Sequence, residues 1–395
     1  MNHESESMED EDFLKNHAVK FIILLGIVSL LADMTYEGAR SITGPYLAVL
    51  GASAFVVAFV SGFGELIGYT LRLVSGYISD RTRRYWTITI VGYFINLMAV
   101  PLLALSGSWE IAAGLLIAER MGKAIRTPAR DVMLSHASSG VGHGWGFGLH
   151  EAMDQIGAIM GPLIIALVLY FKGSYQTGFA ILLIPAVLAL SVLVLSRFLY
   201  PNPHDLEIKT PKLETKDFKH AYWIYMAAVA LIAAGFVDFP LMAFHFKEAL
   251  VTSDSVIPIF YAIAMGVDAL AAIIFGRLFD KIGISTMIIV AVISALFAPL
   301  VFLGGLNLAL IGVVLWGIGL GAQESIMRAA IAGMSPIKRR GTAYGVFNTI
   351  YGVSWFLGSL TMGILYEISI IYLVIFSMIA QLASIPLFLL IEKSK

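Results

Sequence analysis

The sequence predicts an all-α polytopic membrane protein, with twelve transmembrane helices in two pseudo-symmetric bundles of six. The prediction rests on the apolar composition, a series of long apolar runs, and a charged string that occurs in each half of the chain. Hydrophobic residues make up 58% of the 395 residues and charged residues 13%, whereas soluble domains are about 45–50% apolar and about 25% charged. At about 20 residues per span, this length accommodates about twelve helices.

Twelve apolar runs follow one another along the chain. They cover approximately residues 19–49, 54–75, 86–105, 109–131, 143–170, 177–198, 221–247, 255–276, 284–304, 307–330, 341–365 and 369–391. None shows the alternation of apolar and polar residues that a membrane-barrel strand needs, so we expect helices. Glycines four residues apart favour close contacts between these helices, and they occur at Gly64 and Gly68, Gly157 and Gly161, and Gly317 and Gly321.

Two features divide the chain into similar halves. The only long polar connection, at about 199–220, lies between the sixth and seventh runs. A charged string, Gly76-Tyr-Ile-Ser-Asp-Arg-Thr-Arg-Arg84, follows the second run and has a weaker echo, Gly276-Arg-Leu-Phe-Asp-Lys281, 200 residues later. Internal repeats of this kind place a substrate site near the midplane, at the interface of the repeats. The predicted organisation is an acidic cytoplasmic tail at 1–18, a six-helix bundle at 19–198, a cytoplasmic linker at 199–220, a second bundle at 221–391 and a short cytoplasmic tail at 392–395.

The basic residues of the connections predict the orientation in the membrane. With the N-terminus inside, the cytoplasmic connections hold Arg81, Arg83, Arg84, Arg197, Lys209, Lys212, Lys216, Lys219, Arg277, Lys281, Lys338, Arg339 and Arg340. The opposite connections offer little beyond Lys172 and Lys247. Because cytoplasmic loops of membrane proteins carry the excess of Lys and Arg, we expect both termini in the cytoplasm. The acidic N-terminus is unlike a secretory signal, which makes the cell membrane the default location.

Three local motifs carry a resemblance to a known family. The Gly76–Arg84 string resembles the loop between helices two and three of the major facilitator superfamily, Arg120 in span four resembles a cavity arginine, and Gly157-Ala-Ile-Met-Gly-Pro162 is similar to an antiporter motif. With the 6+6 division, the resemblance covers nearly the whole chain and is closest to drug/proton antiporter-type members. It implies two six-helix bundles that rock about a central site. It also implies that Asp80 and Arg81 help to lock the cytoplasmic gate.

Further charged residues near the cytoplasmic side extend the expected gate. Arg126 and Arg130 stand at the cytoplasmic end of span four, at a depth that places them beside Asp80. We interpret them as gate residues, with a place in the cargo site as the alternative. The predicted gate residues are Gly76, Asp80, Arg81, Arg84, Arg126, Arg130 and Asp280.

Carboxylates inside the apolar runs are the candidates for proton coupling, because a buried charge in a membrane helix needs a partner, water or a function. Asp33 and Glu37 share a face of span one, and Asp238 lies at the mirrored position in span seven. Glu151 and Asp154 in span five are further candidates. Two structural alternatives remain, namely an internal ion pair between Glu37 and Arg40, and a capping or kinking role for Asp238 before a proline.

The candidate cavity residues are the polar side chains that these spans share with the carboxylates. They are Tyr36, Arg40, Arg120, His150, Glu324, Arg328 and Asn348. Glu324 and Arg328 are four residues apart, so a pair within one helix is the alternative for them. A set of His150, Glu151 and Asp154 is a weak indication of a divalent-metal site, and no metal is predicted. Glu65 and Arg72 are expected to pair with each other or across helices, and Asp268 has no explanation.

Motifs of soluble chemistry are absent from the sequence. It contains neither a phosphate-binding P-loop nor a dinucleotide fingerprint, and it has no cysteine for thiol chemistry. We therefore expect no cofactor, no enzymatic activity and no nucleic-acid partner. The expected partners are a small-molecule substrate, protons and the lipid bilayer, and the protein is expected to be a monomer.

These observations predict a secondary active transporter that works by alternating access. We expect proton-coupled antiport, that is, efflux of a small organic or amphiphilic solute. The alternatives are a proton-coupled symporter or facilitator for an anionic metabolite, bound by Arg40, Arg120 and Arg328, and, with less support, a divalent-metal exporter. A membrane receptor or a lipid-moving protein is the alternative from a different class.

Overall fold

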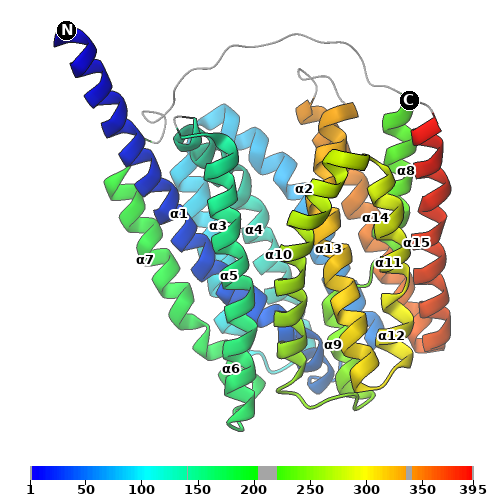
Figure 1. Cartoon of the computed structure of the whole chain (residues 1–395). Helices are drawn as coiled ribbons and strands as arrows, with labels where there is room; N and C mark the ends of the chain where they lie inside the picture. The colour runs from blue at the N-terminus through cyan, green and yellow to red at the C-terminus, as the bar shows by residue number, and fades with distance from the viewer. Residues whose placement is uncertain (1, 140, 203–219, 335–339, 394–395) are drawn as a thin grey trace.

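The computed structural model describes residues 2–139, 141–202, 220–334 and 340–393, and in these ranges it is a bundle of helices without strands (Figure 1). The first half comprises α1 (Asn2–Val49), α2 (Ala54–Thr82), α3 (Tyr85–Leu102), the 3₁₀ turn η1 (Leu103–Leu105), α4 (Trp109–Ser138), α5 (His143–Tyr170), α6 (Tyr175–Ile181) and α7 (Leu183–Leu199). The second half comprises α8 (His220–Gly235), α9 (Phe239–Glu248), α10 (Ile257–Ile282), α11 (Ser285–Ala295), α12 (Phe297–Leu303), α13 (Leu306–Met334), α14 (Arg340–Ile368) and α15 (Ile370–Lys393).

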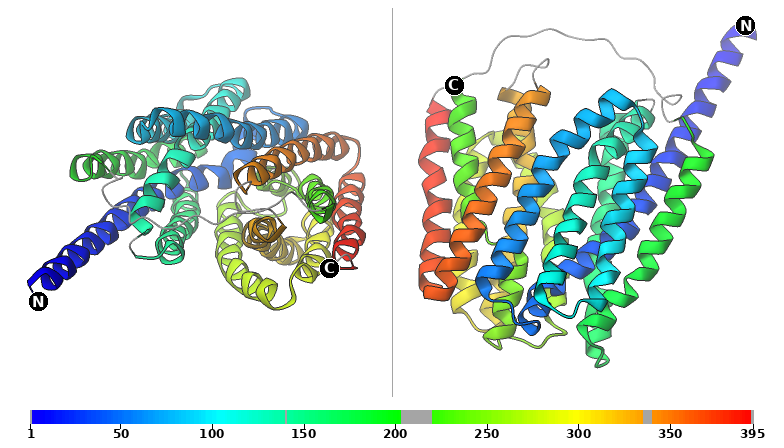
Figure 2. Two further views of the ribbon diagram at one scale, coloured as in Figure 1. Left: turned by 90° about the horizontal axis from the view of Figure 1, so that it is seen from above. Right: turned by 180° about the vertical axis from the view of Figure 1, so that it is seen from behind.

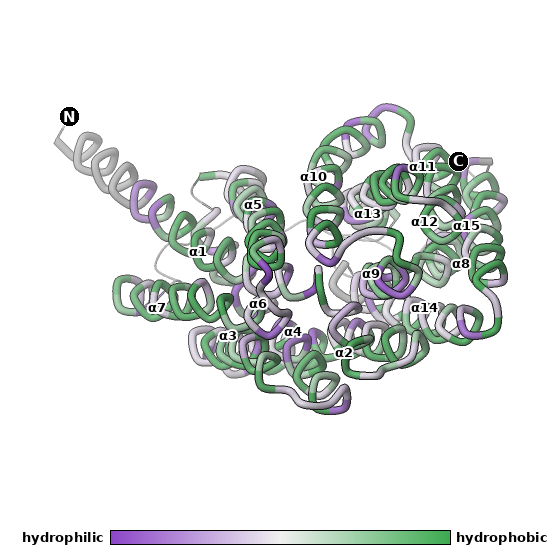
Figure 3. Tube along the Cα trace, turned by 90° about the horizontal axis from the view of Figure 1, so that it is seen from below, coloured by the Kyte–Doolittle hydropathy of each residue, from purple (hydrophilic) through white to green (hydrophobic). Residues whose placement is uncertain are grey.

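Eleven helical stretches of the described residues are long and apolar enough to cross a membrane. Three of them are each built from two short helices, α6 with α7, α8 with α9, and α11 with α12. The twelfth predicted span is α4, which is 30 residues long but carries seven charged residues. Most of the tube around the outside of the bundle is hydrophobic, as Figure 3 shows. The basic residues of α4 from Arg120 to Arg130 and Glu119 are buried or half-buried, so they face the interior.

Both chain termini lie at the same end of the bundle, which we call the terminal end (Figures 1 and 2). The two halves stand side by side, and α2 of the first half packs along α14 of the second while α5 packs along α10. Most of the predicted linker, residues 203–219, lies outside the described residues. The acidic segment is continuous with α1, whose apolar span runs from Lys15 to Val49.

The charged strings differ from the expected loops, because both lie on helices. Helix α2 continues to Thr82, and Arg83 ends it in the left-handed conformation (φ 53°) with its N–H donating to Ser79 O at 2.8 Å. The second string lies within α10, which ends at Ile282. A helix that leaves the membrane loses no backbone hydrogen bonds in water, so the end of an apolar run does not mark the end of its helix.

Helices α1 and α5 pack backbone to backbone at two glycines. A methyl group on Gly157 would overlap Leu30 O, and one on Gly161 would overlap Met34 O. The same holds for Gly317 against Ala264 O at 2.6 Å, whereas nothing lies near Gly68. The contact between α1 and α5 fixes how α1 is rotated, and so which of its side chains point to the centre.

The two halves are in close contact at the end opposite to the termini, which we call the far end. A methyl group on Gly44 of α1 would overlap Pro240 O of α9. At the start of α2, the Phe55 N–H donates to Glu367 Oε1 of α14 at 3.1 Å. The far end is therefore closed in this structure.

Candidate functional site

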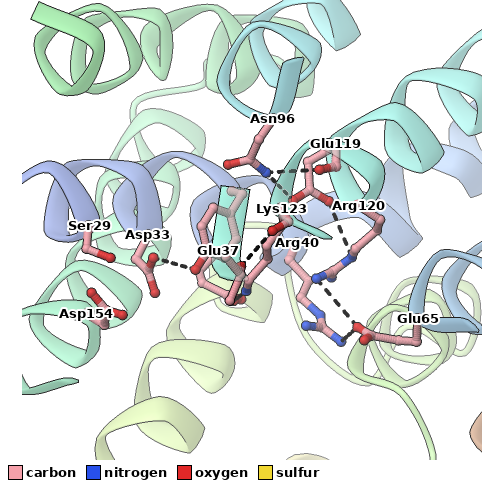
Figure 4. A network of polar contacts seen from close by, with 12 residues as sticks. Ser29, Asp33, Glu37, Arg40, Glu65, Asn96, Glu119, Arg120, Lys123 and Asp154 are labelled. Carbon is pink, nitrogen blue, oxygen red and sulfur yellow. Dashed lines mark hydrogen bonds and ion pairs between the residues drawn. The ribbon is translucent and has the colours of Figure 1, made fainter. Parts of the chain in front are cut away.

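A network of charged side chains lies in the interior of the bundle, where α1, α2, α4, α9 and α10 meet (Figure 4). Its members from α1 and α4 recur every three or four residues, so each helix presents them on one face. The members are Asp33, Tyr36, Glu37, Arg40, Glu65, Glu119, Arg120, Lys123, Arg126, Asp238 and Tyr261. Charges are costly inside a membrane protein and mark substrate or ion pathways, which makes this network the candidate functional site.

Arg40 joins the two halves of the bundle. Its Nη2 atom lies 2.7 Å from Asp238 Oδ1 in the second half and 3.2 Å from Glu65 Oε1 of α2. Asp238 also caps α9 by accepting from the Phe239 N–H at 3.0 Å. Asp238 therefore takes the capping role that was its structural alternative, and it also lies in the cavity wall. Glu65 pairs across helices, with Arg40 of α1 and Arg120 of α4.

Arg120 extends this network along α4. Its Nη1 lies 3.5 Å from Glu65 Oε1, and its Nε lies 3.3 Å from Glu119 Oε2. Asn96 of α3 donates to Glu119 Oε1 at 2.7 Å. Two arginines thus pair with three carboxylates, Glu65, Glu119 and Asp238, which leaves one negative charge in excess.

Glu37 does not form the ion pair with Arg40 that was one of the structural alternatives. Its Oε1 lies 3.8 Å from Lys123 Nζ of α4, and its Oε2 accepts from the Tyr261 hydroxyl of α10 at 2.5 Å. The structure does not support the alternative of a pair within α1, because α4 packs on one side of the face that Glu37 and Arg40 share and α9 on the other. Glu37 is thus a second link between the halves.

Asp33 differs from the other carboxylates of the network. It is 7% exposed, and the hydroxyl of Tyr36 donates to its Oδ1. Among the described residues no cation lies within ion-pair distance of Asp33, although Lys123 Nζ is 4.0 Å from the centre of the Tyr36 ring. A neutral partner leaves the charge of Asp33 uncompensated at close range, which suits a carboxyl group that binds and releases a proton.

Arg126 lies in the interior and not at the expected gate. Its side chain is 1% exposed, and its guanidinium lies 4.1 Å from the centre of the Tyr93 ring and 5.7 Å from that of Tyr36. Asp80, in contrast, is exposed. The expectation was wrong because α4 extends past residue 131 to Ser138, which moves Arg126 deeper than the apolar run suggested.

The polar residues of α5 form a smaller cluster beside the network. Asp154 Oδ2 lies 3.7 Å from His150 Nε2 and 4.0 Å from Arg130 Nη1. Arg130 also donates to Ser29 Oγ at 3.2 Å and pairs with Asp131 at 2.8 Å, so it too belongs to the interior. Glu151 is exposed, whereas His150 is buried.

No group of three or more residues that could hold a metal ion occurs among the described residues. The divalent-metal alternative required His150, Glu151 and Asp154 to converge, and the structure does not bring these three together. The structure therefore gives the metal-exporter alternative no support.

The remaining predicted residues lie outside the network. Asp80, Arg81, Arg84 and Asp280 are exposed at the terminal end, and a methyl group on Gly76 would lie 3.6 Å from Pro128 Cβ. Glu324 is exposed and Asn348 is half-buried. The side chain of Arg328 lies outside the described residues.

The sequence did not predict three residues that pair with members of the network, namely Tyr261, Glu119 and Asn96. The one indication in the sequence was the position of Glu119, directly beside Arg120 within an apolar run.

A cavity adjoins the network on its far-end side. It encloses about 430 Å³ of space, counted out to its opening. The charged and polar residues of its wall are Tyr36, Arg40, Thr43, Ser61, Glu119, Arg120 and Asp238, and Val60, Val100, Leu116 and Pro240 are among the apolar ones. Seven of the twelve lining residues are charged or polar, and polar groups that converge on one cavity are a feature of small-molecule sites.

Comparison with known proteins establishes the family. The model of the Major Facilitator Superfamily matches residues 22–359 and 224–394. The chain belongs to this superfamily. It is therefore a membrane transporter, and the predicted fold of two six-helix bundles is confirmed.

The relatives of this transporter share most of its length. An uncharacterized protein of Mycobacterium tuberculosis is 40% identical over 365 residues, covering 91% of this chain and 89% of the relative. An uncharacterized MFS-type transporter of Methanocaldococcus jannaschii is 29% identical over 381 residues, covering 93% and 92%.

Solved structures show the same fold at low sequence identity. A POT family transporter in complex with 5-aminolevulinic acid superimposes with a TM-score of 0.75 at 13% identity, over 94% of this chain and 95% of that one. A bacterial homologue of the human lysosomal transporter Spinster superimposes with a TM-score of 0.71 at 14% identity, over 95% of both chains. These likenesses show the fold alone.

Proposed function

We propose that this transporter exchanges protons for a small organic or amphiphilic solute by alternating access, with the terminal end in the cytoplasm. The observation that carries the proposal is the ion pair between Arg40 and Asp238, which joins the two halves in the wall of the cavity. Any opening of the far end must separate α1 from α9, and so must break this pair.

Once the pair is broken, Arg40 and Asp238 differ in the ion-pair partners that remain to them. Arg40 keeps a carboxylate partner in its own half, because Glu65 lies 3.2 Å away. Asp238 has no second cation at ion-pair distance in the described residues, so opening leaves its charge exposed to whatever enters from the far end. A proton from that side neutralises Asp238, and re-forming the pair with Arg40 displaces the proton when the far end closes.

Asp33 adds a second proton-binding carboxyl on the same path. It lies one helical turn from Glu37 on α1 and is held by Tyr36, whose ring is covered by Lys123. Protonation of Asp33 removes a buried charge without breaking an ion pair. We therefore place Asp33 and Asp238 ahead of Glu37, which is held by both Lys123 and Tyr261.

Antiport is supported by the residues that place α5 against α1. The glycines of Gly157-Ala-Ile-Met-Gly-Pro162 bring the backbone of α5 against Leu30 and Met34, on either side of Asp33. The sequence motif resembles that of antiporters, and here it controls the packing of the helix that carries the proton-binding carboxyl. If a proton and a solute occupy the same network alternately, the transporter exchanges one for the other across the membrane.

One observation favours a second candidate function. Arg40 and Arg120 both line the cavity, and guanidinium groups are suited to binding carboxylates and phosphates. An anionic solute that displaces Asp238 from Arg40 would travel with the proton that Asp238 then binds. This is proton-coupled uptake of an anionic metabolite, and it differs from the first function in the direction of the linked proton flow.

The test is proton movement in proteoliposomes that contain the purified protein, an imposed pH gradient and an interior pH dye. Lipophilic cations and organic anions are added in turn. We expect cations to drive proton movement opposite to the solute, and we expect Asp33→Asn and Asp238→Asn to abolish it. Glu110→Gln, at an exposed carboxyl in the first turn of α4, is the matched control. Anion-driven movement of protons with the solute would replace antiport by the second function, and unchanged flux in both variants would remove these carboxylates from the mechanism.

A further inference from the structure

A polar contact links α5 of the first half to α10 of the second, apart from the charged network. Gln155 Nε2 of α5 donates to Asp268 Oδ2 of α10 at 3.1 Å. Asp268 is 2% exposed, and its position in the middle of an apolar helix had no explanation from the sequence. A buried carboxylate whose partner is a neutral amide is costly, so this contact calls for a function.

Two acceptor atoms of this pair have no donor in the described part of the chain. They are Asp268 Oδ1 and Gln155 Oε1, and both are buried. Oxygen atoms buried without a hydrogen bond lose the stabilisation that water would give them. One donor placed between the two groups would satisfy both.

Carboxylates lie near Asp268 on three helices packed against α10, namely Glu324 of α13, Glu151 of α5 and Glu37 of α1. Helix α11, which also touches α10, carries no charged residue. The charged residues of α9 that also lie near α10 stand at its far-end turn. The surroundings therefore favour a positive ligand.

On the side of α13, the packing beside Asp268 leaves no room for a group the size of a methyl. Gly321 of α13 lies so close to α10 that a methyl group there would overlap Asp268 O and lie 2.9 Å from Asp268 Oδ1. An ammonium group or a metal ion with its several oxygen ligands needs more space than a methyl group. A proton needs none.

We propose that Asp268 and Gln155 form a proton-binding site that joins the two halves of the transporter. A proton on Asp268 Oδ1 provides the donor that Gln155 Oε1 lacks. The two planar groups then join through two hydrogen bonds in a ring, as a carboxylic acid and a primary amide do, with no net charge in the contact. The proposal rests on the proposed proton coupling and adds a residue of the second half that the Arg40 network does not include.

The site couples proton binding to the position of the halves. Loss of the proton removes one of the two hydrogen bonds and leaves a charge opposite Gln155 Oε1. Because α5 and α10 belong to different halves, any rocking motion changes this contact. Protonation of Asp268 therefore stabilises the arrangement with the far end closed, and deprotonation favours the other one.

The test measures the distance between the halves as a function of pH. The chain has no cysteine, so Trp145→Cys on α5 and Lys281→Cys on α10, both exposed at the terminal end, take spin labels without further changes. We expect the distance distribution to shift with pH. Asp268→Asn should hold the low-pH distribution at every pH, because two amides can form the same two hydrogen bonds. Gln155→Leu, which cannot, should lose the shift and hold the high-pH distribution.

The outcomes separate this site from the proposed function. A pH-dependent shift that persists in Asp268→Asn overturns the site. A shift that is abolished in Asp268→Asn supports the site. This holds even if the proteoliposomes show no solute-linked proton movement, because that result would overturn the proposed function and not the site.

Infrared spectra provide a check that does not depend on transport. The carboxylic C=O band of a protonated buried acid should be present at low pH and reduced in Asp268→Asn. An unchanged band would overturn the assignment.

Discussion

Arg40 and Asp238 are separated by 198 residues in the sequence, and their side chains meet at 2.7 Å in the wall of the cavity. They belong to α1 and to the start of α9, two of the helices that close the far end. The ion pair therefore depends both on the charge state of Asp238 and on the relative position of the two halves.

Removing the negative charge of this pair should open the far end. Asp238→Asn keeps the shape of the side chain, but it loses a charge-assisted hydrogen bond of about 1.5–3 kcal/mol. This corresponds to an increase of about tenfold to a hundredfold in the open population. The readout is the labelling rate of Thr43→Cys, a cavity position, with a membrane-impermeant maleimide added from the far-end side. Glu110→Gln is the control, and an equal rate in Asp238→Asn and the control would show that the pair does not hold this end closed.

The hydroxyl of Tyr261 should matter more than its ring. Tyr261→Phe keeps the packing against Phe239, at 4.4 Å between ring centres, but removes the bond to Glu37. We expect faster labelling of Thr43→Cys and a loss of about 1.5–3 kcal/mol from the contact between the halves. Tyr225→Phe is the matched control, since the Tyr225 hydroxyl donates to Met327 O at 3.1 Å within the second half. An increase of the same size in the control would contradict a specific role for Tyr261.

The glycine contact between α1 and α5 should tolerate no methyl group. Gly161→Ala places a methyl group on Met34 O and about 2.9 Å from Gly38 N, and overpacking of this kind costs about 1–3 kcal/mol. We expect a lower unfolding temperature in detergent, measured by the fluorescence of a dye that binds unfolded protein. Gly148→Ala, on the same helix with nothing within 4 Å, should leave the temperature unchanged or raise it slightly. Equal changes in unfolding temperature at the two positions would mean that the effect comes from helix propensity and not from the close contact.

The bond between Glu367 and the start of α2 should make a small, salt-dependent contribution. Glu367 Oε1 accepts from Phe55 N at 3.1 Å, and a carboxylate at a helix N-terminus contributes about 0.3–1 kcal/mol at low ionic strength. Glu367→Ala should therefore increase Thr43→Cys labelling modestly at low salt and hardly at high salt. Glu248→Ala removes another exposed carboxylate and serves as the control. A salt-independent increase would assign the effect to packing rather than to charge.

The sequence predicted the fold because a membrane leaves few solutions for a long apolar chain. The twelve apolar runs correspond to the helices of the structure, including the charged α4, and Gly157, Gly161, Gly317 and Gly321 lie at close contacts as expected. The predicted symmetry also singled out Asp238 as the counterpart of Glu37, and the structure places it 2.7 Å from Arg40 of α1. Helix ends were less predictable, since α2 and α10 continue through their charged strings.

Within the site, the sequence by itself determined which residues share a helix face, because that follows from a period of 3.6 residues. Asp33, Glu37 and Arg40 were correctly placed together on α1. Which partner each of them meets was decided only by the tertiary structure. Arg40 binds Asp238 and Glu65, and Glu37 binds Lys123 and Tyr261, since the rotation of α1 is set by its glycine contact with α5, and the helices opposite come from parts of the chain up to 224 residues away. Partner choice depends on the packing of five helices at once, and no local spacing encodes it.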